Sequence, residues 1–404
     1  MVGPSKTTVS GLLTIEEALS RILARAQPLP TEPVALREAA GRVLAESARA
    51  RVDLPPFPSS AMDGFAVRAA DTPGTLPVAF RIPAGSPAAE ILPAGAAAAI
   101  ATGGVVPDGA DAVVPIERVS ESDGRIEIPE PVPPGAHIRP RGGDVEEGAV
   151  VVAEGTRLGA AQIGALAAAG IPGVTCSVRP KVAVLATGSE LRAPGESLER
   201  GQIFESNGVL IGAALAAAGA EVEHLPVVAD EQEAHREALS RGLEADVLVT
   251  SGGVSMGPHD LVRRVAAELG VEEVFWGVAV KPGKPLSFGV RGATLAFGLP
   301  GNPVSCLVSS LLFVAPALLA RQGLARPGPA FETGRAAVAL RQNPRRDEFV
   351  RARRRFEEGG VALEPVSGQE SHMIVRAATA DALIHVPRGT GEVPAGATLR
   401  YLAF

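Results

Sequence analysis

The stretch Asp246-Val-Leu-Val-Thr-Ser-Gly-Gly-Val-Ser-Met-Gly257 decides how this chain of 404 residues folds. A short apolar strand runs directly into a loop that has almost no side chains. Two further loops of glycine and proline follow after intervening strands, Lys281-Pro-Gly-Lys-Pro285 and Gly298-Leu-Pro-Gly-Asn-Pro303. In a chain that alternates strands with helices, such loops collect at the carboxyl edge of one sheet, where ligands bind. Because small residues let backbone N–H groups approach an anion closely, the stretch predicts a pocket for a phosphorylated ligand.

The residues on either side of this stretch alternate strands with helices from Lys181 to about Gln322. The strands that hydrophobic patterning predicts are Lys181–Ala186, Val222–Val228, Val247–Thr250, Glu273–Val280, Leu286–Phe288 and Thr294–Phe297. The predicted helices are Asn207–Ala218, Glu231–Gly242, Pro258–Leu269 and Pro303–Ala320. This order predicts a doubly wound α/β domain.

The segments outside this domain do not alternate strands with helices in the same way. Thr14-Ile-Glu-Glu17 is a capping box that predicts a helix through Ala26, and a second short helix is expected from about Leu36 to Ala45. Short strands punctuated by glycine and proline follow, at Val78–Arg81, Ala98–Thr102, Ala112–Ile116 and Arg125–Ile128, and predict a small β domain. Residues 145–169 read as a strand and then a helix. Beyond residue 326, short strands alternate with turns and suggest a β-barrel.

Composition excludes several classes of protein. A net charge of −7 argues against general binding of nucleic acid. The two cysteines, Cys176 and Cys306, form no zinc motif and no disulfide framework, which fits a reducing cytoplasm. The first residues contain no apolar segment typical of a signal peptide. Residues 292–320 carry no charge, but prolines interrupt them, so a buried core helix is favoured over a membrane span.

Several charged residues in the loops have both a structural and a functional interpretation. Glu190 follows a strand of the α/β domain and should project at the carboxyl edge of the sheet, where it is either a solvated acid or part of a site. Asp260, in the first turn after Pro258, could complement the helix dipole or hold a cation beside a bound phosphate. Lys281 and Lys284 stand on a backbone stiffened by prolines and suit an oxyanion; because surface lysines need no such rigid setting, this function is favoured over a surface turn.

Other polar residues are weaker candidates. Asn302 followed by Pro303 is a helix start, whatever else it does. Asp63 alone reads as a turn residue, and Arg139-Pro-Arg-Gly-Gly-Asp144 as a solvated turn. Most of the arginines from Arg345 to Arg355 are expected to form a solvated basic strand.

The chain carries a set of short motifs in a fixed order. They are Pro55-Pro-Phe-Pro-Ser-Ser-Ala-Met-Asp-Gly-Phe-Ala66, Ala101-Thr-Gly-Gly-Val-Val-Pro-Asp-Gly-Ala-Asp-Ala-Val-Val114, Arg139-Pro-Arg-Gly-Gly-Asp144, Ala186-Thr-Gly-Ser-Glu190, Ser251-Gly-Gly-Val-Ser-Met-Gly257, Lys281-Pro-Gly-Lys-Pro285, Gly298-Leu-Pro-Gly-Asn-Pro-Val-Ser305 and Ser367-Gly-Gln-Glu-Ser-His372. Together they resemble the molybdopterin molybdenumtransferase (MoeA) family, which includes the E domain of gephyrin. Any one motif is weak, whereas the ordered set is specific and covers nearly the whole chain.

The resemblance implies a four-part architecture. Residues 1–54 and 142–178 would form an extended, discontinuous domain, and residues 55–141 a small β domain. Residues 179–326 would form the molybdopterin-binding α/β domain, and residues 327–404 a C-terminal β-barrel. The resemblance also implies a homodimer whose site is shared between subunits, which would bring Asp63 to residues far away in sequence.

The implied reaction inserts molybdate into adenylylated molybdopterin with release of AMP. Asp63, Glu190, Asp230 and Asp260 match the acidic positions of the family; the last three would hold Mg²⁺, together with phosphate oxygens. Substrate-binding positions carried over by the resemblance are Thr102, Asp144, Ser251, Gly252, Gly253, Lys281, Lys284, Pro300, Asn302, Arg346, Arg351 and Ser371. The chain departs from the family at Phe65, Ser189 and Gly104, which stand where relatives often have Tyr, an Asp or Asn, and Ala.

Two other functions remain open at this point. A molybdopterin adenylyltransferase has an α/β domain like the one expected here, but would not need residues 1–178 or the barrel. A non-catalytic scaffold could have lost its acidic residues, which this chain keeps. We expect the protein to be cytoplasmic, to act downstream of a molybdopterin adenylyltransferase, and to bind neither nucleic acid nor a membrane.

Overall fold

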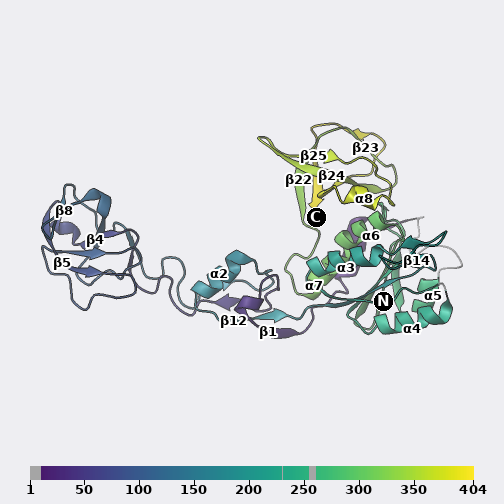
Figure 1. Cartoon of the computed structure of the whole chain (residues 1–404), viewed down its shortest axis with the longest axis horizontal. Coiled ribbons are helices and arrows are strands. Elements are labelled where there is room, and N and C mark those ends of the chain that lie inside the picture. The colour runs from purple at the N-terminus through teal and green to yellow at the C-terminus, as the bar shows by residue number, and fades with distance from the viewer. Residues whose placement is uncertain (1–10, 230, 254–260) are drawn as a thin grey trace, which may run out of the picture. The chain divides into compact units, whose positions relative to one another are not determined.

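The computed structural model describes residues 11–229, 231–253 and 261–404, which form two compact units (Figure 1). Unit 1 comprises Met1–Glu32, Gly41–Ala45 and Cys176–Phe404. Unit 2 comprises Pro33–Ala40 and Glu46–Thr175. The chain therefore leaves unit 1 early, builds unit 2, and returns. The short strands β1 (Thr31–Ala35) and β12 (Gly173–Ser177) pair where it leaves and returns.

Unit 1 contains the predicted α/β domain, built on a six-stranded sheet. Its strands lie in the order β16 (Glu221–His224), β13 (Lys181–Ala186), β17 (Val247–Ser251), β21 (Thr294–Leu299), β20 (Ser287–Arg291) and β18 (Glu272–Trp276). The first four are mutually parallel, whereas β20 runs antiparallel to both of its neighbours. This topology confirms the prediction of a doubly wound α/β domain.

Helices cover both faces of the sheet, so its central strands are apolar throughout. Val182, Val184 and Val249 face a core shared with α3 (Asn207–Ala217), α6 (Pro303–Ser309) and α7 (Ala315–Arg321). The residues between them, Ala183 and Leu185, face the other core, shared with α4 (Gln232–Gly242) and α5 (Leu261–Glu268). Successive side chains along a strand point to opposite faces of the sheet, so apolar side chains cover both faces and exclude water from them.

The apolar segment from residue 303 to residue 321 lies inside the first of these cores. By length and composition it could cross a membrane, but 67% of its most apolar window is buried within the protein. It was predicted as one helix, Pro303–Ala320, but a π-helical turn at Ser310–Val314 separates α6 from α7. Pro316 lies in the first turn after this segment and has no N–H to donate, which favours such a local change of hydrogen bonding.

The first helix, α1 (Ile15–Leu23), packs its apolar face into the same core. The predicted capping box is present: Glu17 N donates to Thr14 Oγ1 at 3.1 Å, and Thr14 N donates to Glu17 Oε2 at 2.8 Å. Ile15, Ala18 and Ile22 are buried among residues of the sheet and of α7. The core of unit 1 is therefore made of segments from both ends of the chain.

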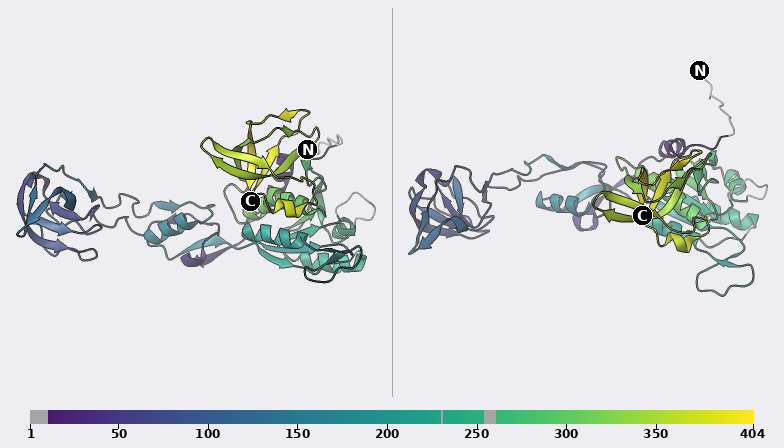
Figure 2. Two further views of the ribbon diagram at one scale, coloured as in Figure 1. Left: turned by 45° about the horizontal axis from the view of Figure 1, so that its top comes forward. Right: turned by 90° about the horizontal axis from the view of Figure 1, so that it is seen from above.

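A closed barrel of five strands completes unit 1 (yellow and green in Figures 1 and 2). Its strands are β24 (Asp347–Glu357), β25 (Gly360–Pro365), β22 (Phe331–Ala336), β28 (Thr398–Ala403) and β26 (Ala382–Val386), and β26 pairs back with β24. A short strand of the α/β domain, β19 (Val280–Lys281), pairs in parallel with β24. The barrel sheet and the Lys281 loop are thus joined through backbone hydrogen bonds.

Unit 2 is built on a second six-stranded sheet, drawn in blue in Figure 1. Its strands lie in the order β7 (Ala112–Pro115), β4 (Gly64–Val67), β6 (Ala97–Ile100), β5 (Gly74–Ile82), β9 (Arg125–Ile128) and β8 (Ser120–Ser122). Phe65 and Val67 face one core and Ala66 the other. A smaller part carries α2 (Ala160–Ala168) and the paired strands β2 (Ala48–Arg49) and β11 (Val150–Val152).

The elements predicted at residues 36–45 and 273–280 also differ from those in the structure. The helix expected from Leu36 to Ala45 is only a 3₁₀ turn, Leu36–Glu38, and Gly41 has a φ of +76° that a helix cannot accommodate. The strand expected over Glu273–Val280 is divided at Gly277, where φ is +87°. That turn redirects the chain from β18 in one sheet to β19 in the other, and so places Lys281 beside the barrel.

Candidate active site at the carboxyl edge of the sheet

The loops after β13, β17 and β21 meet at one edge of the sheet, as expected. Thr187 N donates to the carbonyl of Ser251 at 3.1 Å, and Gly252 N donates to the carbonyl of Leu299 at 3.2 Å. Gly252 has a φ of +90°, and a Cβ there would lie 2.9 Å from the Thr187 carbonyl oxygen. Glycine is therefore required at this position both by its backbone angle and by the close approach of the neighbouring loop.

A side chain that the sequence interpretation missed ties two of these loops together. Asn207, at the first turn of α3, donates from Nδ2 to Ser251 Oγ at 2.8 Å and to the carbonyl of Gly301 at 2.8 Å. Its Oδ1 atom is buried and accepts no hydrogen bond within the described residues. Its position at a helix start that follows a strand was the signal that could have identified it.

A buried thiol, that of Cys306, holds the loop after β21 in place. Cys306 donates to the carbonyl of Pro300 at 2.8 Å, and its Sγ lies 3.5 Å from Ser251 Oγ. Burial raises the pKa of Cys306 to about 12, so the thiol stays protonated. Asn302 precedes α6 at its N-cap position, but its side chain is exposed and makes no capping hydrogen bond. The side-chain amide of Asn302 is therefore exposed at the carboxyl edge of the sheet.

Of the three residues predicted to hold Mg²⁺, Glu190 is described, whereas Asp230 and Asp260 lie outside the described residues. Glu190 is exposed, and its carboxylate lies against Gly188: a Cβ on that glycine would be 2.7 Å from Glu190 Oε2. Across the parts of the chain that the structure describes, no three Asp, Glu, His or Cys side chains are grouped to hold a metal. The exposed carboxylate is nevertheless the kind of oxygen donor that Mg²⁺ binds together with phosphate.

The two lysines of the 281–285 loop, which are predicted to bind an oxyanion, line different cavities in this structure. Lys281 pairs with Glu348 of β24 at 2.9 Å, and lines a cavity of about 600 Å³ that also contains Gln369. Lys284 is exposed and lines a cavity of about 970 Å³ together with Arg346. The pairing of β19 with β24 separates them, because it turns Lys281 toward the barrel.

The expectation that Arg351 offers its guanidinium to a ligand is not met in this structure. Arg351 is 1% exposed and donates to the carbonyls of Gly368 at 2.8 Å, Glu370 at 3.1 Å and Met373 at 2.7 Å. These bonds hold the loop that carries Ser371, whose carbonyl accepts from Val304 N at 3.0 Å. Arg351 thus positions the barrel loop against the start of α6.

Unit 2 contains the remaining predicted residues, and it brings two of them together. Asp63 Oδ1 accepts from Thr102 N at 2.6 Å and from Thr102 Oγ1 at 2.8 Å. Donation by the Thr102 backbone, followed by its hydroxyl, holds the pKa of the Asp63 carboxyl below its ordinary value. Asp63 is thus a carboxylate that stays ionised.

Asp144, another predicted site residue of unit 2, is exposed, and its backbone N–H donates to the carbonyl of Leu54 at 2.9 Å.

The departures from the family pattern are explained in part by packing. Phe65 is 1% exposed in a core of unit 2, so an apolar ring suits it. At Gly104 a Cβ would lie 2.8 Å from Ile100 Cγ1, so an alanine would require a local shift. Ser189 is exposed beside Glu190, and nothing in the structure explains this substitution.

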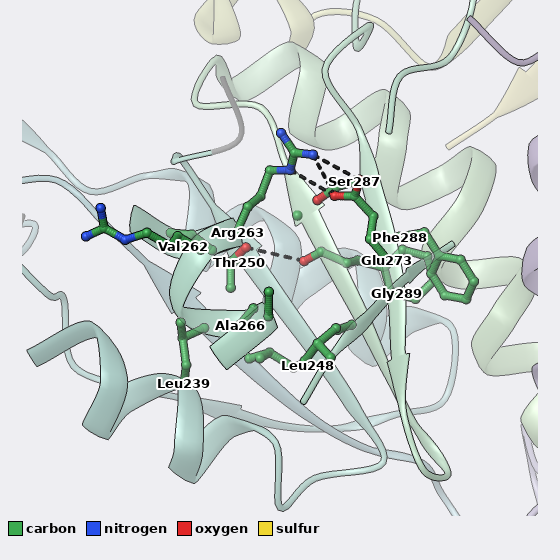
Figure 3. A pocket seen from close by; sticks show the side chains of 16 residues that line it. Leu239, Leu248, Thr250, Val262, Arg263, Ala266, Glu273, Ser287, Phe288 and Gly289 are labelled. Carbon is green, nitrogen blue, oxygen red and sulfur yellow. Dashed lines mark hydrogen bonds and ion pairs between the residues drawn. The ribbon is translucent and has the colours of Figure 1, made fainter. Parts of the chain in front are cut away.

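An apolar cavity of about 360 Å³ lies between α5 and the sheet and contains none of the predicted site residues (Figure 3). Leu239, Leu248 and Val262 are among the residues that line it. Arg263 pairs with Glu273 through contacts of 2.7 to 2.9 Å. The lining is mainly apolar, and its charged residues include Arg263 and Glu273, which are paired with each other.

Comparison with known proteins matches most of the chain. Three family models apply: the MoeA N-terminal region (domains I and II) at residues 13–170, a probable molybdopterin binding domain at residues 183–320, and the MoeA C-terminal region (domain IV) at residues 333–404. A molybdopterin molybdenumtransferase of Haemophilus influenzae is 36% identical over 395 residues, which cover 96% of this chain and 98% of the relative. Molybdopterin molybdenumtransferase 2 of Mycobacterium tuberculosis is 37% identical over 382 residues, covering 91% and 93%.

Solved structures agree with these relatives. The molybdopterin biosynthesis moeA protein of Pyrococcus horikoshii superposes with a TM-score of 0.83 at 30% identity and covers 98% of this chain and 100% of that chain. A second structure from this organism gives a TM-score of 0.77 at 32% identity, with coverage of 97% and 99%. The likeness therefore extends over both units.

Proposed function

The chain belongs to the MoeA family of molybdopterin molybdenumtransferases, and from this premise we propose that it inserts molybdate into adenylylated molybdopterin with Mg²⁺-dependent release of AMP. One observation carries the proposal within the structure. At the edge of the sheet, Asn207 ties the loops after β17 and β21 together through Ser251 and Gly301. Thr187 N joins the loop after β13 to the carbonyl of Ser251. Such an edge presents backbone N–H groups and small residues to an anionic ligand.

Each predicted site residue has a proposed role. Glu190, Asp230 and Asp260 would hold Mg²⁺, which when bound would neutralise charge on the phosphoanhydride. Ser251, Gly252 and Gly253 would orient the substrate. Because Gly252 N donates to the carbonyl of Leu299, Gly252 would contribute the close approach of its backbone rather than its N–H. Lys281 and Lys284 would offset negative charge from two different cavities, together with Arg346. Thr102 would keep Asp63 ionised, so that this carboxylate can orient an attacking water.

We further propose that the protein is a cytoplasmic homodimer. Asp63 and Thr102 belong to unit 2, whereas Glu190 and Ser251 belong to unit 1. In the proposed dimer, unit 2 of one subunit completes the site on unit 1 of its partner. The adenylylated substrate would come from a molybdopterin adenylyltransferase acting upstream.

The test is an assay of AMP release from adenylylated molybdopterin, with and without molybdate and Mg²⁺. We expect AMP and molybdenum-loaded cofactor to form only when both are present. Glu190→Gln should slow product formation roughly 100-fold or more, because the carboxylate is lost without a change of shape. Glu199→Gln, a matched change at an exposed acid of the same segment, should leave the rate unchanged.

Two results would contradict the proposal. Net synthesis of adenylylated molybdopterin from ATP and molybdopterin would identify an adenylyltransferase instead. Full restoration of molybdoenzyme activity by Asp63→Asn and Glu190→Gln variants in a deficient strain would favour a non-catalytic scaffold.

A further inference from the structure

The motif Arg139-Pro-Arg-Gly-Gly-Asp144 of unit 2 is anchored to another stretch of the chain, whereas the sequence predicted a solvated turn. Asp144 N donates to the carbonyl of Leu54 at 2.9 Å, and Leu54 N donates to the carbonyl of Val145 at 2.8 Å. The Asp144 side chain is exposed. Its direction therefore depends on the backbone of the turn, and a group that fixes this backbone also fixes the Asp144 carboxylate.

The carboxylate of Asp53 binds this turn on both sides of Asp144. Asp53 Oδ1 accepts from Glu147 N at 2.8 Å, and Asp53 Oδ2 accepts from Arg141 Nε. Arg141 precedes Asp144 in the chain and Glu147 follows it. A single half-buried carboxylate thus connects the two ends of the segment that carries Asp144.

These hydrogen bonds are made to a charged acceptor. Donation by the Glu147 backbone, followed by the Arg141 guanidinium, holds the pKa of the Asp53 carboxyl below its ordinary value. Hydrogen bonds to an ionised carboxylate are stronger than those between neutral groups. Gly142 completes the arrangement, because its φ of +67° bends the chain around Asp53 in a conformation that other residues rarely adopt.

We propose that Asp53 is a positioning residue, which through Arg141 and Glu147 fixes the turn that presents Asp144 to the substrate. A displacement of about 1 Å in a group that orients a substrate is enough to reduce the rate roughly 100-fold. The restraint on the turn follows from the contacts of Asp53. That the Asp144 carboxylate meets the substrate rests on the proposed function.

Kinetics of AMP release test the consequence for the reaction. Asp53→Ala should raise the KM for adenylylated molybdopterin at least about tenfold and leave kcat within about threefold, because a misplaced Asp144 weakens binding. Asp71→Ala is the matched control: Asp71 is also half-buried in unit 2, and its Oδ2 accepts from Gly95 N at 2.9 Å. This control should keep the KM of the unchanged protein.

A second variant separates the charge of Asp53 from its backbone contact. Asp53→Asn keeps an acceptor for Glu147 N and loses the charge that pairs with Arg141. It should raise KM by less than Asp53→Ala does, because one of the two restraints on the turn is retained. An equal rise in the two variants would show that the hydrogen bond to Glu147 does not contribute to the restraint.

A double-mutant cycle shows whether Asp53 acts through Asp144. Asp144→Asn alone should raise KM, because it removes the carboxylate without a change of shape. Asp53→Ala added to Asp144→Asn should then raise KM by less than about twofold further, since the group that Asp53 positions is already absent. Losses that add fully in the double variant would show that Asp53 acts by another route.

Hydrogen exchange of the full-length protein, followed by mass spectrometry, tests the restraint without turnover. In Asp53→Ala the amides of residues 141–147 should exchange at least about tenfold faster, whereas Asp71→Ala should leave them unchanged. Amides of unit 1 check that each variant is folded.

Two results would overturn the inference: unchanged exchange of residues 141–147 in Asp53→Ala, or faster exchange with an unaltered KM. Absence of AMP release from the unchanged protein, together with faster exchange in Asp53→Ala, would reject the proposed function alone.

Discussion

At the scale of single residues, Asp63 shows how an exposed loop carboxylate is kept ionised. Its Oδ1 atom accepts two hydrogen bonds from one residue, Thr102, and both donors favour the charged form. The pKa of Asp63 is lowered first by the backbone donor and then by the hydroxyl. A group whose pKa is lowered on folding contributes stability above its unfolded pKa and loses it as the pH falls through the folded pKa.

Thr102→Val tests this arrangement, because it removes the hydroxyl donor and retains the backbone donor and the shape. We expect the pKa of Asp63 to rise, so the acid limb of the pH–rate profile should move to higher pH while the rate at neutral pH changes little. The profile of AMP release measures this shift. Thr75→Val, at an exposed strand position of the same unit, serves as the control. An equal shift of the acid limb in that variant would show that the shift does not arise from Asp63.

At the scale of elements, the loop after β17 depends on the absence of a side chain. Gly252 and Gly270 have nearly the same backbone angle, with φ of +90° and +85°. A Cβ at Gly252 would meet the Thr187 carbonyl oxygen at 2.9 Å, whereas a Cβ at Gly270 meets nothing within 4 Å. Alanine is strained at both positions by about 1 kcal/mol, so a comparison of the two isolates the steric contact.

Gly252→Ala should therefore reduce molybdenum insertion by at least about tenfold, because the loop must move to relieve the contact. Gly270→Ala should keep its activity and lose only the stability that the backbone strain accounts for. Steady-state rates measure the activity of both variants, and chemical denaturation measures their stability. Equal activity in the two variants would show that the close approach of the Thr187 loop has no role in catalysis.

Patterns in the sequence predicted the elements whose two faces are buried in a regular way. Val182, Ala183 and Val184 alternate between two cores, so all three are apolar, and short apolar runs of this kind between predicted helices identified the strands of the sheet. The sequence did not reveal that Gly277 sends β19 into another sheet, because a turn angle does not state which neighbour a strand will meet. The separation of Lys281 from Lys284 depends on that pairing, and the burial of Arg351 depends on carbonyl groups of the loop from Gly368 to Met373. Local sequence patterns do not specify either set of contacts.

At the scale of the whole molecule, unit 1 is assembled from distant parts of the chain. Helix α1 contributes Ile15, Ala18 and Ile22 to a core whose other buried residues, apart from Ala26, all come from Val182 onward. Its amphipathic face is thus a structural element of the α/β domain. Contacts of this kind link sequence positions about three hundred residues apart, so they form late in folding.

Ile22→Ala should lower the stability of unit 1 by about 2–5 kcal/mol, because it removes a fully buried side chain from a packed core. Ser20→Ala, at an exposed position of the same helix, should change stability by less than about 0.5 kcal/mol. Denaturation followed through Trp276 measures unit 1 selectively, since the only tryptophan lies there. A small effect of Ile22→Ala would show that α1 docks only loosely.

The order in which a ribosome makes this chain has a consequence for α1. The helix emerges first, yet Leu312 and Phe313, which share its core, are added almost three hundred residues later. At synthesis rates of about 5–20 residues per second, the delay is roughly 15 to 60 seconds. Unit 2 is complete long before then, while the apolar face of α1 stays uncovered. Newborn chains of this protein are therefore expected to engage chaperones through residues 15–22, and to release them once the segment after Pro303 has been made.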